Sequence, residues 1–278
     1  MSTKFVVLLI VLCFAACTRV GTQTNNPSPI GPGPAPQTIE KITNSAKIVH
    51  VLVVLCDNEN QGIVPVPAHL GNGEDPNKNL YWGAAYGVKT YFGKSRNWEK
   101  LATVAAPKEN VLERVVFKHK TTNVYLVADA YRGSKMKETI DDFFAAVSGA
   151  KLENVAVGEQ NIQVLGSADV VAFVGHNGLM DFELEREIVK KDEAKREAII
   201  LACASRRYFA GHLKKTSARP LLWTTNLMAP EAYILHDALD GWIAGETDSQ
   251  IQLRAAAAYA KFQRISVKSA GKLLVTGW

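Results

Sequence analysis

Cysteine, excess charge and long apolar runs are all scarce in this chain of 278 residues. The formal net charge is +5, from 32 basic and 27 acidic residues, and no stripe of Lys and Arg with interleaved aromatic residues occurs. This balance does not favour nucleic-acid binding, so we expect no nucleic-acid partner. Hydrophobic residues make up 47% of the chain and no internal repeat is present, which is typical of one globular domain with a sizeable core.

The N-terminus has the layout of an export signal. Lys4 precedes the apolar run Phe5–Phe14, which is too short to span a bilayer comfortably, and small residues then lead to Cys17. The tetrapeptide FAAC resembles a bacterial lipobox, in which the cysteine is lipidated and becomes the new N-terminus. We therefore expect an exported protein of the cell envelope, in the periplasm or on the outer surface, anchored to the membrane through a lipid on Cys17. Ordinary signal cleavage nearby, or a retained anchor, is the alternative.

A tether follows the export segment. Residues 18–40 contain the stretch RVGTQTNNPSPIGPGPAPQT, in which proline, glycine and polar residues dominate. Such a segment cannot form a core, so we interpret it as a link between the signal, residues 1–17, and one domain over residues 41–278. Only Cys56 and Cys203 then remain in the domain.

Apolar runs alternate with helical patterns along the domain. Strands are expected at Ile48–Leu55, Glu113–Lys118, Asn123–Ala128, Val170–Val174, Ala198–Ala202 and Pro220–Thr225. Helices are expected at Asn79–Phe92, Ser134–Val147, Ser205–Leu213, Pro230–Glu246 and Gln250–Ile265. This alternation predicts an α/β fold, a three-layer sandwich with a mostly parallel central sheet.

Two of the expected strands end on side chains with useful chemistry. The stretch VVAFVGHNG places His176 after one strand, and AIILACAS places Cys203 after the next. In parallel sheets, ligands bind beyond the carboxyl ends of the strands. A thiol attacks a carbonyl group as its thiolate, which a nearby imidazole and a helix N-terminus, here the one expected at Ser205, both favour. The pattern therefore predicts acyl-transfer chemistry by a His–Cys pair.

The same two motifs resemble those of a known family. A hydrophobic strand ending in His and Gly, then a spacer, then a hydrophobic strand ending in Ala–Cys is similar to the signature of the caspase-like cysteine peptidases, which include caspases, metacaspases, legumains, gingipains and clostripains. The resemblance covers Lys47 to about Glu246 as strand order and motif placement. It implies a caspase-like fold and a hydrolase, a peptidase acting on peptide or protein substrates, without a cofactor or metal. It also implies that His176 is the general base or acid, Cys203 the nucleophile and Gly178 an oxyanion-hole N–H donor.

Further polar residues at the same strand ends are candidates for substrate binding. They are Asp57, Asn177, Ser205, Arg206 and Thr225. Arg206 could hold an acidic substrate group. In caspase-like folds, the strand end that corresponds to Thr225 forms one wall of the substrate pocket. Asp57 could bind substrate or orient His176. Solvated, turn-forming and capping roles are the alternatives for these residues.

Two alternatives for the cysteines remain open. In an oxidising compartment Cys56 and Cys203 could form a disulfide, which would block the nucleophile. Cys56, Asp57, His176 and Cys203 are also residue types that bind zinc, although they lack the close CxxC or HExxH spacing of typical zinc sites.

The function itself also has an alternative. Asn177 separates His176 from Gly178, which the family pattern places side by side. A displaced Gly178 amide would leave the oxyanion unsupported. The chain could then be a catalytically inactive caspase-like fold that acts as a binding or scaffold module of the cell envelope.

Overall fold

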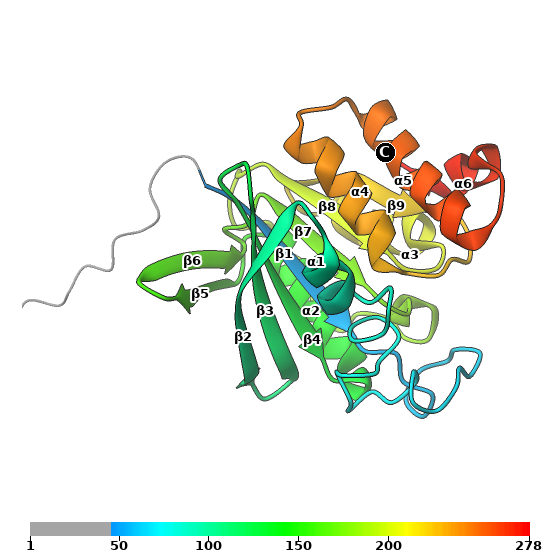
Figure 1. Ribbon diagram of the computed structural model, residues 1–278, viewed down its shortest axis with the longest axis horizontal. Helices are drawn as coiled ribbons and strands as arrows, with labels where there is room; N and C mark the ends of the chain where they lie inside the picture. The colour runs from blue at the N-terminus through cyan, green and yellow to red at the C-terminus, as the bar shows by residue number, and fades with distance from the viewer. Residues whose placement is uncertain (1–45) are drawn as a thin grey trace, which may run out of the picture. The chain divides into compact units, whose positions relative to one another are not determined.

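The computed structural model describes residues 46–278 (Figure 1). The expected signal, the lipidation site at Cys17 and the tether over residues 18–40 all lie outside the described residues. In the described part of the chain, none of the helices has the length and apolar character needed to cross a bilayer.

Eight strands form one mixed, mostly parallel sheet with the order β10-β9-β8-β7-β1-β4-β3-β2. Its strands are β1 (Lys47–Val54), β2 (Trp98–Lys108), β3 (Val111–His119), β4 (Val124–Tyr131), β7 (Val170–Val174), β8 (Arg196–Leu201), β9 (Ala218–Thr224) and β10 (Leu274–Val275). The five central strands β9, β8, β7, β1 and β4 are parallel. The antiparallel strands β10, β3 and β2 extend the two sides. A separate hairpin consists of β5 (Leu152–Val157) and β6 (Gln160–Leu165).

Continuous apolar sequence explains the central strands. Every residue of β4 and β7 is buried, as are all residues of β1 except Lys47. Strands covered on both faces need apolar side chains at odd and even positions, and these segments supply them. The α/β class and the largely parallel sheet are therefore confirmed.

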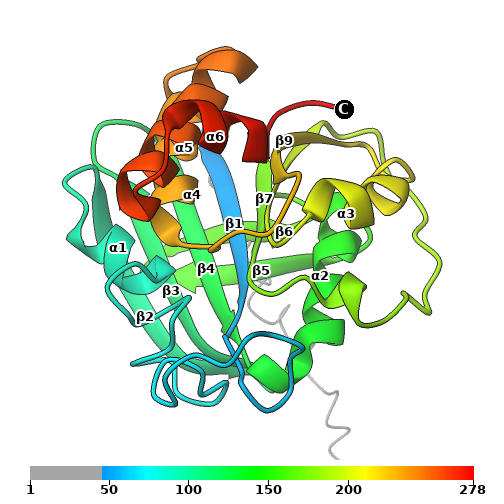
Figure 2. The same ribbon diagram turned by 90° about the vertical axis from the view of Figure 1, so that its right-hand side faces the viewer.

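Helices cover both faces of the sheet, which gives the three layers (Figures 1 and 2). One face packs against α1 (Val88–Lys94), α4 (Ala232–Ile243), α5 (Asp248–Gln263) and α6 (Val267–Leu273). The other face packs against α2 (Met136–Val147), α3 (Ser205–Leu213) and the hairpin β5–β6. Two short 3-10 helices, η1 (Gly133–Lys135) and η2 (Gly178–Met180), complete the list of helices in residues 46–278.

The sequence predictions differ from the structure at one helix start and in several elements that were not predicted. The helix expected at Asn79–Phe92 begins only at Val88, because the preceding residues form tight turns in which a Cβ at Gly87 would collide with the backbone of Trp82. Strand β2 was not predicted, since it is an exposed edge strand with few apolar residues. The hairpin β5–β6, α6 and β10 were also missed. The remaining predicted strands and helices are present within a few residues of their expected bounds.

The strand order changes direction at β1. β4 pairs with β1 on one side, and β7 pairs with β1 on the other side. α/β sheets bind ligands beyond the carboxyl ends of their strands, at the point where the strand order reverses. The residues after β1, β7 and β8 lie at this carboxyl edge.

Candidate functional site

His176 and Cys203 lie at the carboxyl edge on adjacent parallel strands. In the β7–β8 pair Val174 is level with Leu201, and the Gly175 N–H continues the pairing by donating to the Leu201 carbonyl at 3.1 Å. The pairing ends there, so His176 and Cys203 each lie two residues beyond the last paired residues of these adjacent strands.

His176 is held by a carboxylate that follows it closely in sequence. Its Nε2 lies 2.6 Å from Oδ2 of Asp181, and the imidazole is buried with 8% exposure. The turn that allows this begins at Gly175, whose φ of +151° and close packing on Val54 exclude a side chain. Since Nε2 is paired with Asp181, Nδ1 is the nitrogen left for proton transfer.

Cys203 sits at a sharp turn before α3. Ala204, the next residue, has φ +48° and ψ +34°, the left-handed conformation that non-glycine residues rarely adopt. Strain of this kind costs about 1–3 kcal/mol and is concentrated at functional sites. The turn places the partly buried thiol just before the N-terminus of α3, where the helix dipole is positive.

The Cys203 thiol contacts the loop that follows β9. Its Sγ lies 3.5 Å from the Met228 carbonyl oxygen and accepts from the Met228 N–H at 3.4 Å. Within residues 46–278 no hydrogen bond joins His176 to Cys203. Catalytic hydrogen bonds are often long in free enzymes and tighten when substrate binds, so this geometry is compatible with a pair that is not yet engaged.

Asn177 links the two loops. Its Nδ2 donates to the Cys203 carbonyl at 2.6 Å, and its Oδ1 accepts from the Leu179 N–H at 3.1 Å, which caps η2. Asn177 is fully buried, so it is not available to contact substrate directly. The residue that interrupts the family pattern therefore fixes the His176 loop against the Cys203 turn.

Cys56 is a second free thiol on the same side of the sheet. No disulfide joins Cys56 and Cys203, and both are free. Burial raises the pKa of Cys56 to about 11, although a hydrogen bond with Tyr81 opposes the shift. Tyr81 also lies near Cys203, and the pKa of Tyr81 is raised well above its usual value by burial and by the two neighbouring thiols. Cys56 thus stays protonated at neutral pH and is a poor nucleophile.

We expect the two cysteines to differ strongly in reactivity. In the native protein at pH 7.5, iodoacetamide should alkylate Cys56 at least about 100-fold more slowly than Cys203, because Cys56 is fully buried and its thiolate is disfavoured. Peptide mapping by mass spectrometry after timed quenching measures each site separately. In urea the two rates should converge, and similar rates in the native state would contradict the assignment.

Asp57 and Ser205, two of the predicted substrate-binding residues, are used inside the fold. The Asp57 carboxylate accepts hydrogen bonds from the backbone of Glu59 and Asn60 and from Asn60 Nδ2, so it stabilises its own loop. Ser205 Oγ donates to the Ile200 carbonyl and accepts from the Thr224 N–H, both at 2.9 Å. These contacts give both side chains structural roles.

The other predicted residues differ in exposure. Arg206 is exposed on the first turn of α3 and faces solvent. Thr225 is exposed, and its hydroxyl donates to the Lys272 carbonyl at 2.8 Å, which ties the end of β9 to α6. Gly178 is buried as the first residue of η2, where a Cβ would collide with Met136. Its N–H has no partner within a helix at that position and is the candidate oxyanion donor.

Sequence reasoning missed Asp181, the residue that orients His176. Asp181 lies five positions after His176 in the same quoted stretch, and only the turn of η2 brings its carboxylate back to the imidazole. It also missed Met228 and Tyr259, whose hydroxyl accepts from the Ala229 N–H at 3.2 Å beside the thiol. No local motif marks these two, because they reach the site from the loop after β9 and from α5.

Metal ligation by the two cysteines is not supported. In residues 46–278, the single group of three or more His, Cys, Asp or Glu side chains with converging ligand atoms is His236, Asp237 and Asp240. That group lies on α4 and includes none of the zinc candidates expected from the sequence.

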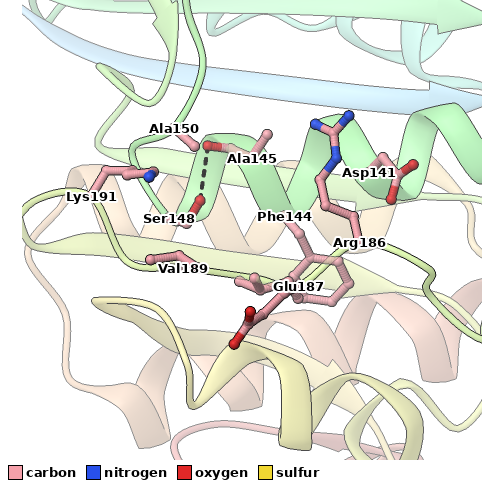
Figure 3. A pocket seen from close by; sticks show the side chains of 10 residues that line it. Asp141, Phe144, Ala145, Ser148, Ala150, Arg186, Glu187, Val189 and Lys191 are labelled. Carbon is pink, nitrogen blue, oxygen red and sulfur yellow. Dashed lines mark hydrogen bonds between the residues drawn. The ribbon is translucent and has the colours of Figure 1, made fainter.

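A cavity lies on the opposite face of the sheet. It has a volume of about 240 Å³ between α2 and residues 186–191, with Asp141 and Arg186 at one end and Lys191 at the other (Figure 3). Phe144 in its wall belongs to the core beneath α2 and α3, whereas Met228, which contacts Cys203, packs on the other core. The cavity therefore does not serve the Cys203 thiol.

Comparisons with known proteins give no family. No protein-family model, no curated protein and no solved structure matches this chain.

Proposed function

We propose that the chain is a cysteine hydrolase, a peptidase, in which Cys203 is the nucleophile and His176 the general base. The observation that supports this proposal most directly is that His176 and Cys203 each follow, by two residues, the last paired residues of the adjacent parallel strands β7 and β8. The hydrogen bond from Asn177 to the Cys203 carbonyl joins the two loops that carry them. A nucleophile, a base and a third group that orients the base are the parts that covalent catalysis requires.

The proposed reaction is acyl transfer in two steps. Cys203 Sγ attacks the carbonyl carbon of the substrate while its proton passes to His176 Nδ1, and the Gly178 N–H stabilises the oxyanion. The bond to the leaving amine then breaks as His176 returns the proton to the amine nitrogen. Water, deprotonated by His176, then attacks the thioester carbon. The C–S bond breaks, the acid is released, and His176 returns the proton to Cys203 Sγ. Asp181 stabilises the imidazolium that forms in each step.

The proposal includes a caspase-like fold. In support, the parallel strands follow the order β4-β1-β7-β8-β9, with His176 after the third of them in chain order and Cys203 after the fourth. The stretches VVAFVGHNG and AIILAC supply the resemblance in sequence. We further propose export to the cell envelope and a lipid anchor at Cys17, supported by the charged start, apolar run and FAAC stretch of the N-terminus.

One observation favours a second function. The Cys203 sulfur contacts the backbone of Met228, and it shares no hydrogen bond with His176 in the described residues. If this arrangement persists when ligands bind, the domain is an inactive member of that fold that serves as an envelope binding module.

Peptide cleavage separates the two functions. The reduced, full-length protein is incubated with a mixture of peptides of varied sequence, and products are identified by mass spectrometry. We expect cleavage by the wild type and by Cys56→Ala, and none by Cys203→Ala. Cleavage that persists in Cys203→Ala would remove it as the nucleophile, and a wild type that cleaves nothing would favour the binding module.

A further inference from the structure

Three metal-ligating side chains converge on α4, apart from the Cys203 site. His236 Nδ1 lies 2.9 Å from Asp237 Oδ1 and 3.7 Å from Asp240 Oδ2, and the ligand atoms of all three residues lie within 4.8 Å of one another. Positions 236 and 240 are one helical turn apart and share a face of α4, and Asp237 reaches the imidazole from beside it.

This cluster is at the amino edge of the sheet. Lys47, the first residue of β1, places its Nζ 4.7 Å from the ring centroid of Trp242, two residues beyond Asp240. His176 and Cys203 follow the opposite ends of their strands. The cluster is therefore independent of the proposed hydrolase site.

Neighbouring side chains hold the ligands in place. Ser95 Oγ lies 2.8 Å from His236 Nε2 and accepts the Asn97 N–H at 3.1 Å. When the imidazole carries its proton on Nε2, Ser95 accepts it and Nδ1 is the nitrogen that binds a metal, which is the usual arrangement of a metal-binding histidine. Asn97 Nδ2 also donates to Asp240 Oδ2 at 3.1 Å.

One oxygen of the cluster lacks a partner. Asp240 Oδ1 is buried and makes no hydrogen bond within residues 46–278. A buried carboxylate oxygen without a partner is costly, and a cation next to that carboxylate would offset the cost.

The spacing fits a small divalent ion. Zinc bonds of about 2.0–2.1 Å in a tetrahedron separate neighbouring ligand atoms by about 3.3–3.4 Å, and the two His236 distances lie on either side of that value. His236 also lines a cleft of about 490 Å³ together with Tyr91, Lys94 and Arg96. The cleft leaves room for a fourth, non-protein ligand.

We propose that His236, Asp237 and Asp240 form a binding site for a divalent transition-metal ion, with Zn²⁺ as the best match. One imidazole with two carboxylates suits Zn²⁺ better than Mg²⁺ or Ca²⁺, which prefer all-oxygen ligands.

Isothermal titration of the full-length protein with ZnCl₂ tests the site. We expect the wild type to bind one Zn²⁺ at this site, His236→Gln and Asp240→Asn to bind it at least 10-fold more weakly, and Ser95→Ala to show a smaller loss. MgCl₂ should give no comparable binding. Circular dichroism without metal confirms that each variant is folded.

Two control variants identify the site. His212→Gln removes a histidine from α3, and Cys203→Ala removes the more exposed of the two described cysteines, and both should retain wild-type affinity at the α4 site. Zinc binding that is unchanged in His236→Gln and Asp240→Asn, or lost only in Cys203→Ala, would overturn the proposal, as would a wild type that binds no Zn²⁺.

Discussion

Replacing His176 with alanine is expected to slow the reaction of Cys203 with a peptide-derived electrophile by about 10²–10⁴-fold, the usual contribution of a general base. His176 follows the strand that neighbours the one before Cys203, and Asp181 holds its Nε2 at 2.6 Å. Without the imidazole, the proposed acceptor of the thiol proton is missing. Asp181→Asn should cause an intermediate loss, because the amide keeps the shape but no longer stabilises imidazolium.

Rates of adduct formation at Cys203, followed by mass spectrometry at several reagent concentrations, measure this effect. His212→Ala is the matched control, since His212 lies on α3 without contacting Cys203, and it should react like the wild type. Thermal unfolding of each variant separates loss of reactivity from loss of fold. If His176→Ala reacts as fast as the wild type, His176 is not the base and the binding-module function gains support.

Asp129→Asn is expected to lower the free energy of unfolding by about 3–5 kcal/mol, the cost of breaking a buried ion pair from one side. Asp129 and His50 are fully buried, and Arg114 is nearly so. Arg114 Nε and Nη2 donate to the two Asp129 oxygens at 2.5 and 2.6 Å, and His50 Nε2 lies 3.2 Å from Oδ2. The Asn variant leaves the imidazole without its carboxylate partner, and the guanidinium keeps only its pair with Glu153.

The buried cluster of Asp129, Arg114 and His50 also predicts that the stability of the protein depends on pH. Burial by itself would raise the pKa of Asp129, but Arg114 and His50 outweigh it and hold the pKa well below the usual range. A depressed pKa in the folded state means that the contribution to stability is complete above the unfolded-state pKa and is lost as the pH falls. The wild type should therefore lose stability below about pH 5, and Asp129→Asn should lose less.

Urea unfolding monitored by circular dichroism at pH 7 and pH 4 measures both effects. Glu193→Gln, which breaks an exposed pair with Lys190, is the control and should change stability by less than about 1 kcal/mol. The double variant Asp129→Asn/Arg114→Met should be more stable than the sum of its single variants, because the two charges are removed together. A loss under about 1 kcal/mol for Asp129→Asn would show that the cluster is not a stabilising ion pair.

The strands of the fold were predictable where burial of a segment determines which residue types it contains. Strands β1, β4, β7 and β8 are largely apolar, since a strand with helices on both faces favours apolar side chains, and the buried polar exceptions His50 and Asp129 pair with each other. Strand β2 escaped prediction because it lies at an edge, where pairing with β3 stabilises a largely exposed strand. The helix start at Val88 was not predicted, because the aromatic residues before it pack into the core from turns rather than from a helix.

For the candidate site, the sequence by itself determined that His176 and Cys203 follow buried strands, since the apolar runs and the polar residues that end them are local features. Their place on adjacent strands and their partners were decided only by the tertiary structure. Pairing of β7 with β8 put the two residues after neighbouring strands, η2 returned Asp181 to the imidazole, and the loop after β9 brought Met228 to the thiol. These contacts depend on strand register and loop closure between segments far apart in the chain, and no periodicity in the sequence encodes such distances.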